Sequence, residues 1–171
     1  MPSPSTLDRA LAVMRIDLGS TPAYRQPVLV KVVIATILAI IGSLVADALL
    51  VVVGTHAFPS TKGYVHFQFH DYAKLTIIGI VIACAAWPIM VRISKAPRWL
   101  FFRLAIVVTL VLLLPDLYIL HQGQPFKAVA FLMLMHLAIG IITYNVLVRL
   151  APARRRHVNR WTSPAQAEES A

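Results

Sequence analysis

The chain has 171 residues, of which 58% are hydrophobic and only 13% are charged, whereas an average soluble domain is about 45–50% apolar and about 25% charged. The apolar residues lie in blocks, so the composition favours a membrane protein. A net charge of +9 would suggest nucleic-acid binding in a soluble protein, but here the basic residues flank the apolar blocks and indicate membrane topology, with no nucleic-acid partner. The single cysteine, Cys84, excludes thiol-redox chemistry that needs a cysteine pair.

Residues 1–27 precede the first apolar block and form the expected N-terminal segment. Apolar residues between 7 and 18 recur at helical spacing with charged residues between them, which predicts a short amphipathic helix on the cytoplasmic membrane surface. A disordered tail is the alternative. The segment does not resemble a signal peptide, because the first apolar run begins only near Val28 and no small-residue cleavage pattern follows it.

The central region, 28–150, contains four long apolar runs. The predicted spans are about 32–54, 74–92, 100–120 and 127–149. A helix needs roughly 20 apolar residues to cross the hydrocarbon core, with about 17 tolerated. We therefore predict an all-α fold, an integral membrane four-helix bundle with the lipid bilayer as its first partner.

The basic residues indicate the orientation of this bundle. Thirteen lysines and arginines lie in the N-terminal segment, the loop after the second span and the tail, against three in the other two loops. The positive-inside rule places both termini in the cytoplasm of a multi-pass protein of the cell membrane. The tail, 151–171, begins with the basic run 154–156 and is expected to end in a disordered polar segment.

Each predicted span carries small or polar residues on one helical face, as packed membrane helices prefer. These stripes are Thr36, Ser43 and Asp47 in the first span, Thr76, Gly79, Ala83 and Ala86 in the second, Thr109 and Asp116 in the third, and His136, Gly140 and Thr143 in the fourth. We expect the stripes to face the centre of the bundle and the remaining apolar side chains to face lipid.

Three ionisable residues, Asp47, Asp116 and His136, lie within these stripes. An unpaired carboxylate at mid-span costs about 2.5–3.5 kcal/mol, so such residues are candidates for a functional site. By depth alone, His136 is the expected partner of Asp47. The pair is either a static hydrogen bond that fixes helix register or a site that moves a proton or holds a cation.

Pro115 directly precedes Asp116. Proline within a helix removes one backbone hydrogen bond, and we expect it to end the third span and to make Asp116 a boundary residue. The alternative is a discontinuous helix whose freed carbonyl lines an ion site.

The longest connection, 55–73, is rich in aromatic residues and histidines. Such rings ordinarily belong to the interfacial belt of a membrane protein. His66 and His70 are four residues apart and Asp71 follows them, so a helix there would place both imidazoles on one face and form a weak candidate metal site. The H-E-x-x-H pattern is missing.

The sequence carries no recognised catalytic motif. It lacks the G-x-S-x-G, P-loop and G-x-G-x-x-G patterns. This favours a protein that is not an enzyme, and no cofactor is expected. A membrane enzyme acting on lipids through dispersed residues remains an alternative.

Two segments carry a family resemblance: Leu-Leu-Leu-Pro-Asp at 112–116 and Leu-Met-Leu-Met-His-Leu at 132–137. The chain resembles a family of small four-helix membrane proteins, mostly from actinobacteria, known only as a domain of unknown function. The resemblance covers about 28–149. It implies that Pro115 ends the third span and that Met135 and His136 form the family's Met-His pair inside the fourth. It implies no activity.

Three functions follow as hypotheses. The first is a structural or accessory membrane component that associates with a second copy or with another membrane protein. The second is a small proton- or cation-coupled transporter subunit that uses Asp47, Asp116 and His136. The third is a metal-binding or lipid-acting membrane enzyme that uses the histidines of 55–73.

Overall fold

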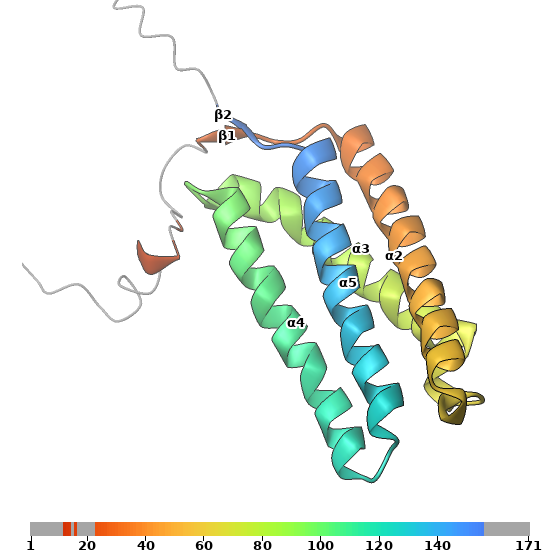
Figure 1. Ribbon diagram of the computed structural model, residues 1–171. Helices are drawn as coiled ribbons and strands as arrows, with labels where there is room; N and C mark the ends of the chain where they lie inside the picture. The colour runs from red at the N-terminus through yellow and green to blue at the C-terminus, as the bar shows by residue number, and fades with distance from the viewer. Residues whose placement is uncertain (1–11, 15, 17–22, 156–171) are drawn as a thin grey trace, which may run out of the picture.

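Four long antiparallel helices make up most of the computed structural model, which describes residues 12–14, 16 and 23–155 (Figure 1). They are α2 (Leu29–Ala57), α3 (Phe69–Ile93), α4 (Pro97–His121) and α5 (Phe126–Leu150). Each is long and apolar enough to cross a membrane. The prediction of an all-α four-helix membrane bundle is therefore confirmed. Most of the predicted amphipathic N-terminal helix and residues 156–171 of the C-terminal tail lie outside the described residues.

All four helices extend beyond the predicted spans by at least one residue at each end. Pro97 begins α4, where its missing N–H loses no hydrogen bond. Pro115 does not end the helix as expected, because α4 continues to His121. Membrane helices tolerate an internal proline when neighbouring groups compensate the lost backbone hydrogen bond. Asp116 is therefore a residue of the helix interior and not of its boundary.

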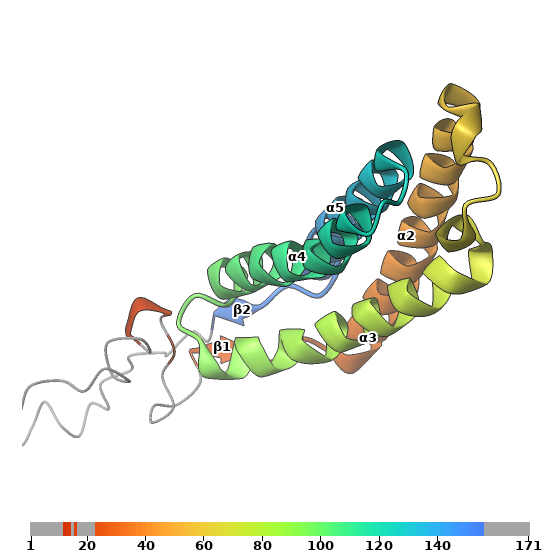
Figure 2. The same cartoon turned by 90° about the horizontal axis from the view of Figure 1, so that it is seen from below.

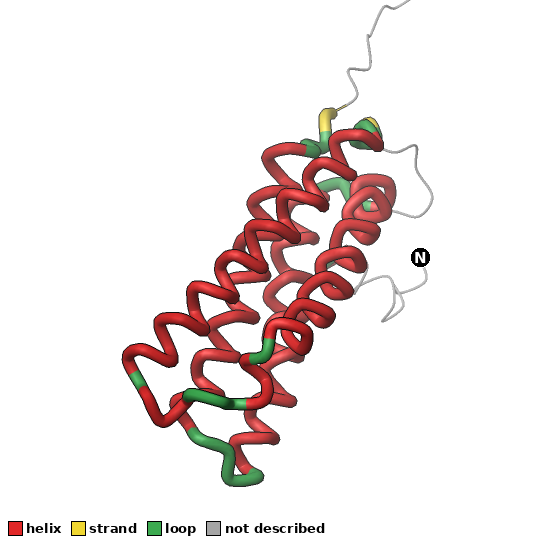
Figure 3. Tube along the Cα trace, turned by 90° about the vertical axis from the view of Figure 1, so that its right-hand side faces the viewer, coloured by secondary structure: helices red, strands yellow, loops and turns green. Residues whose placement is uncertain are grey.

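The helices are arranged with α5 between α2 and α4. The α2–α5 contact is the most extensive and the α4–α5 contact is second. Figure 2 shows α4 and α5 side by side, with α2 and α3 on the other side of the bundle. The tube in Figure 3 shows that the connections gather at the two ends of the helices.

A small antiparallel ribbon joins the two ends of the helical region. It pairs β1 (Tyr24–Arg25), just before α2, with β2 (Arg154–Arg155), just after α5; Tyr24 lies opposite Arg155. We call this the terminal end of the bundle; it also holds the end of α3 and the start of α4. The opposite end, with the α2–α3 and α4–α5 connections, is the loop end. The sequence patterns gave no sign of this ribbon.

The inward faces agree with the predicted stripes in α2 and in part elsewhere. Ser43 and Asp47 are fully buried, and Thr143 of α5 is 5% exposed. In α3 the prediction was wrong at Gly79, which is exposed. The buried face of α3 is instead built around Ile80, one residue further along. Larger side chains are needed there because α3 packs less closely on α4 and α5 than α2 does on α5.

The buried apolar residues form two separate clusters within the bundle. Near the terminal end, Trp87 is fully buried and its ring lies 5.1 Å from that of Phe101. Near the loop end, Phe67 packs with Leu132 and Met135. The outer faces of all four helices expose leucine, isoleucine and valine, as helices in contact with lipid do.

The closeness of α4 and α5 gives a first testable prediction. A Cβ added at Gly140 would lie 2.9 Å from Oγ1 of Thr109, whereas one added at Gly79 would meet no described atom within 4 Å. We expect Gly140→Ala to lower the free energy of unfolding by about 1–3 kcal/mol through overpacking. Gly79→Ala, the matched control, should leave it unchanged or raise it by up to about 1 kcal/mol. Unfolding with SDS in mixed micelles measures both.

The same contact predicts a rescue. Adding Thr109→Ala to Gly140→Ala removes the atom that the new methyl group meets, so the double variant should regain most of the lost stability. Equal stability of Gly140→Ala and the wild type would contradict the close packing of these two helices.

Candidate functional site

Each of the four helices contributes one residue to a buried polar cluster in the half of the bundle nearer the loop end. We call Asp47 of α2, Thr76 of α3, Asp116 of α4 and His136 of α5 the polar cluster. Asp47 is fully buried, while Thr76 and Asp116 are about 5% exposed or less. Carboxylates are almost never buried to this degree unless they have partners. The four residues therefore form the site at which polar groups replace apolar packing.

Helix register places the cluster at one depth. A Cβ on Gly54 would contact the ring of Phe131, and one on Gly42 would contact Ile142. Between these two contacts α2 and α5 run antiparallel, so Asp47 and His136 both lie in the interval. Hydrogen bonding and ion pairing then bring Thr76 and Asp116 to the same level.

Asp47 is bound by a threonine of the neighbouring helix. The hydroxyl of Thr76 donates a hydrogen bond of 2.9 Å to Oδ2 of Asp47. The other carboxylate oxygen, Oδ1, is buried and has no hydrogen-bond partner among the described residues. A neutral carboxyl has a proton for this position, and a charged one needs a water or a cation there. Oδ2 of Asp47 thus has a hydrogen-bond partner, and Oδ1 has none among the described residues.

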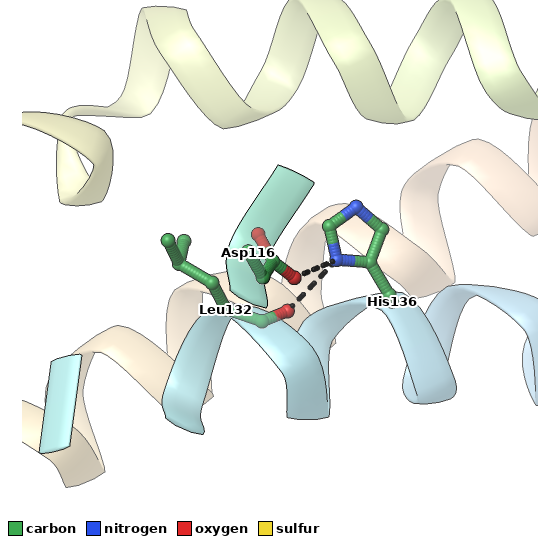
Figure 4. Close-up of polar contacts among 3 residues, drawn as sticks. All are labelled: Asp116, Leu132 and His136. Carbon is green, nitrogen blue, oxygen red and sulfur yellow. Dashed lines mark hydrogen bonds and ion pairs between the residues drawn. The ribbon is translucent and has the colours of Figure 1, made fainter. Parts of the chain in front are cut away.

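Asp116 and His136 form an ion pair across α4 and α5 (Figure 4). Oδ2 of Asp116 lies 3.0 Å from Nδ1 of His136. The same nitrogen lies 3.1 Å from the carbonyl oxygen of Leu132, one turn earlier on α5. Both neighbours are acceptors, so Nδ1 carries a proton.

The direction of the Nδ1–H bond favours the carbonyl. The contact with Leu132 has hydrogen-bond geometry, whereas Oδ2 of Asp116 meets no aligned donor in the described part of the chain. Oδ2 of Asp116 lies 3.0 Å from the same nitrogen, and charge attraction adds to this contact when the imidazole carries a proton on both nitrogens. The second ring nitrogen points away from Asp116, towards the ribbon of α3 (Figure 4).

A tyrosine of the loop end is affected by the charge of the cluster. Tyr64 lies in the α2–α3 connection, and its ring packs edge-on against Phe67 at 5.3 Å. Burial, and after it the charge of Asp116, raises the pKa of the Tyr64 hydroxyl above its ordinary value, so this group stays protonated at neutral pH. The hydroxyl oxygen is buried without a hydrogen-bond partner among the described residues. The hydroxyl is therefore a buried donor without a partner among the described residues.

Two further hydroxyl groups extend the polar region towards the terminal end. Oγ of Ser43 and Oγ1 of Thr143 are buried and have no partner within the described residues. The contact between Gly42 and Ile142 puts them at similar depth on α2 and α5. Together with Oδ1 of Asp47, they give three buried oxygens with unused hydrogen-bonding capacity.

The sequence therefore identified the ionisable members of the cluster, but the expected pairing was wrong. His136 contacts Asp116, and Asp47 is hydrogen-bonded by Thr76. Depth alone pointed to Asp47, but it is Oδ2 of Asp116 that lies 3.0 Å from the imidazole. Thr76 already lay on the predicted inward stripe, which was the signal for its role. Nothing in the sequence pattern pointed to Tyr64.

The candidate metal ligands at the loop end do not share a helical face. His66 belongs to a short 3-10 helix, Val65–Phe67, and the extended backbone of Gln68 separates it from α3, where His70 lies. Nε2 of His70 contacts Oδ1 of Asp71 at 3.2 Å. In the described ranges, no group of three histidine, cysteine or acidic side chains is arranged to hold a metal ion.

Comparison with known proteins gives one match. A family model described as a family of unknown function (DUF6069) matches residues 20–153. No curated protein and no solved structure matches the chain. The matched segment contains β1, all four helices and every residue of the polar cluster.

Proposed function

The chain belongs to the DUF6069 family of unknown function, and we propose that this member is a structural or accessory component of the cell membrane. In this proposal it crosses the membrane four times with both termini in the cytoplasm. The polar cluster holds its helices in register, and partner proteins or a second copy associate with the outer helical faces.

The observation that carries this proposal is that each helical hairpin has its own polar contact. In the α2–α3 hairpin, Asp47 of the first helix accepts a hydrogen bond from Thr76 of the second. In the α4–α5 hairpin, Asp116 of the first helix contacts His136 of the second. Polar contacts of this kind join membrane helices. Both hairpins thus have one polar contact between their two helices, at the same depth. This is the arrangement expected of a protein whose helices keep fixed positions.

The charge distribution supports the proposed orientation. Nine of the basic residues within 23–155 lie at the terminal end and three lie at the loop end. The three at the loop end are Lys62, Lys74 and Lys127. The positive-inside rule assigns the terminal end to the cytoplasm.

A second candidate function, proton or cation coupling, rests on the unsatisfied oxygens. Oδ1 of Asp47, Oγ of Ser43 and Oγ1 of Thr143 have no partners among the described residues. Buried polar groups are ordinarily satisfied by protein, water or an ion. Oxygen atoms alone suit hard cations, and a carboxyl with an open oxygen suits a proton.

One reconstitution experiment separates the two candidates. Wild type, Asp47→Asn and Asp71→Asn are placed in liposomes, and proton and sodium fluxes are followed with entrapped dyes. Asp71→Asn is the matched control, because it makes the same change at a carboxyl outside the cluster. The scaffold proposal expects all three to match protein-free liposomes.

A flux through the wild type that persists in Asp71→Asn and disappears in folded Asp47→Asn would overturn the scaffold proposal. It would establish Asp47 as an ion or proton site instead. Folding of each variant is checked by its elution from a sizing column and by its helical circular dichroism.

A further inference from the structure

A cavity of about 320 Å³ opens at the terminal end, away from the polar cluster. Its lining includes Tyr24 and Arg155 of the β1–β2 ribbon and Arg98 and Trp99 from the first turn of α4. Nε of Arg155 donates to the hydroxyl of Tyr24 at 3.4 Å. The ribbon therefore contributes one arginine to the lining, and the start of α4 contributes another.

Two arginines and no carboxyl group are found among the described residues that line the cavity. Both arginines are exposed. Among the described residues the only carboxyl side chains are Asp47, Asp71 and Asp116, and all three lie towards the loop end. The cavity also faces the N-terminus of the 25-residue α4, where the helix dipole is positive. Ala96, the N-cap, has no polar side chain to satisfy the first amide groups of the helix.

The depth of the cavity in the membrane indicates which kind of anion can bind there. The apolar run of α4 begins within its first turn, so the cavity lies where the span leaves the hydrocarbon. Trp99 is at this level, with the guanidinium of Arg103 stacked 3.9 Å from its ring centre. Tryptophan and arginine prefer the headgroup region of a bilayer. The anionic groups found at that depth are lipid phosphates.

The chemistry of the lining fits a phosphate diester. Arginine guanidinium groups bind phosphate oxygens through paired N–H donors. Arg98 and Arg155 both line the cavity, and the Tyr24 hydroxyl, which accepts from Nε of Arg155, keeps its own proton as a further donor. We propose that this cavity binds the phosphate of an anionic phospholipid headgroup from the leaflet at the terminal end.

The test measures lipid binding to the full chain in neutral detergent. Phosphatidylglycerol is titrated and bound lipid is counted by native mass spectrometry, with phosphatidylcholine as the comparison lipid. Arg98→Gln combined with Arg155→Gln should weaken phosphatidylglycerol binding roughly 25-fold, because each basic residue in contact with the anionic headgroup contributes about a fivefold gain in affinity. Arg92→Gln combined with Arg149→Gln is the matched control. It removes two exposed arginines of the same end that do not line the cavity, and its affinity should change less than twofold.

A second variant distinguishes a loss of lipid binding from a loss of folding. Ala96→Asp places a carboxylate at the edge of the cavity and at the N-cap of α4. An N-cap aspartate stabilises a helix, so this variant should melt no lower than the wild type and yet lose phosphatidylglycerol binding by roughly tenfold.

The remaining results would overturn the proposal. Equal losses in the two double-arginine variants would mean general surface charge and no site. Equal binding of phosphatidylcholine would mean that the negative headgroup is not recognised. Inorganic phosphate at millimolar concentration serves as the soluble competitor; displacement of the lipid by phosphate alone would assign the cavity to a soluble anion.

Discussion

Replacement of His136 by leucine is expected to destabilise the protein by about 2.5–3.5 kcal/mol, the cost of an unpaired carboxylate within a membrane span. In the wild type, Oδ2 of Asp116 lies 3.0 Å from Nδ1 of His136. Leucine is similar in volume to histidine, so the change removes the charge partner and leaves little empty space. Asp116 is only 5% exposed, which leaves it few routes to water. Unfolding with SDS in mixed micelles measures the loss.

A double-mutant cycle makes this prediction specific. Asp116→Leu combined with His136→Leu removes both polar partners, and replacing a buried ion pair by apolar residues of similar volume is often neutral or stabilising. We expect the double variant to be more stable than His136→Leu alone. His121→Leu, at the exposed end of α4, is the control and should change stability little. Additive losses from the two substitutions would show that Asp116 and His136 do not interact.

Replacement of Trp87 by alanine is expected to lower the free energy of unfolding by about 3–5 kcal/mol, through a cavity at the terminal end. The Trp87 side chain is fully buried. Its Nε1 donates a hydrogen bond of 2.8 Å to the carbonyl of Ala151, immediately after α5. The variant therefore loses packing and leaves a buried carbonyl without its donor. The loss is measured by SDS unfolding, as for His136.

Two controls divide this loss into its parts. Trp87→Phe keeps most of the ring and removes only the donor, so its loss should be about 1–3 kcal/mol. Ile89→Ala on the same helix removes an exposed side chain and should have a small effect. If Trp87→Phe proved as stable as the wild type, the hydrogen bond to Ala151 would not contribute to joining α3 and α5.

The site could be predicted in part because burial follows a simple rule along each helix. Polar residues are costly in lipid, so they face inward, and Asp47 and Asp116 are buried as this rule requires. The polar rule also holds in α3, where Thr76 is buried, but the small-residue signal failed there, because Gly79 is exposed and Ile80 is buried. Small residues mark an inward face only where helices approach closely, and the contacts of α3 with α4 and α5 are less extensive than the contact of α2 with α5.

The residues that the sequence did not single out, near the polar cluster and at the cavity, come from elements without a periodic signal. Tyr64 lies in a connection with short 3-10 turns, so no helical phase places its hydroxyl near Asp116. Tyr24 and Arg155 meet only because the β1–β2 ribbon pairs segments from the two ends of the chain. Two-residue strands are too short to show an alternating pattern.

The sequence by itself determined that the chain crosses a membrane as four helices, and which residues are ionisable within them. It could do so because a backbone in lipid must satisfy its own hydrogen bonds, which makes length and hydropathy sufficient. Only the tertiary structure decided that His136 meets Asp116 and that Asp47 meets Thr76. Sequence gives a depth along each helix axis, whereas pairing depends on which helices are neighbours and how each is rotated. The same limit hid the cavity between the ribbon and α4.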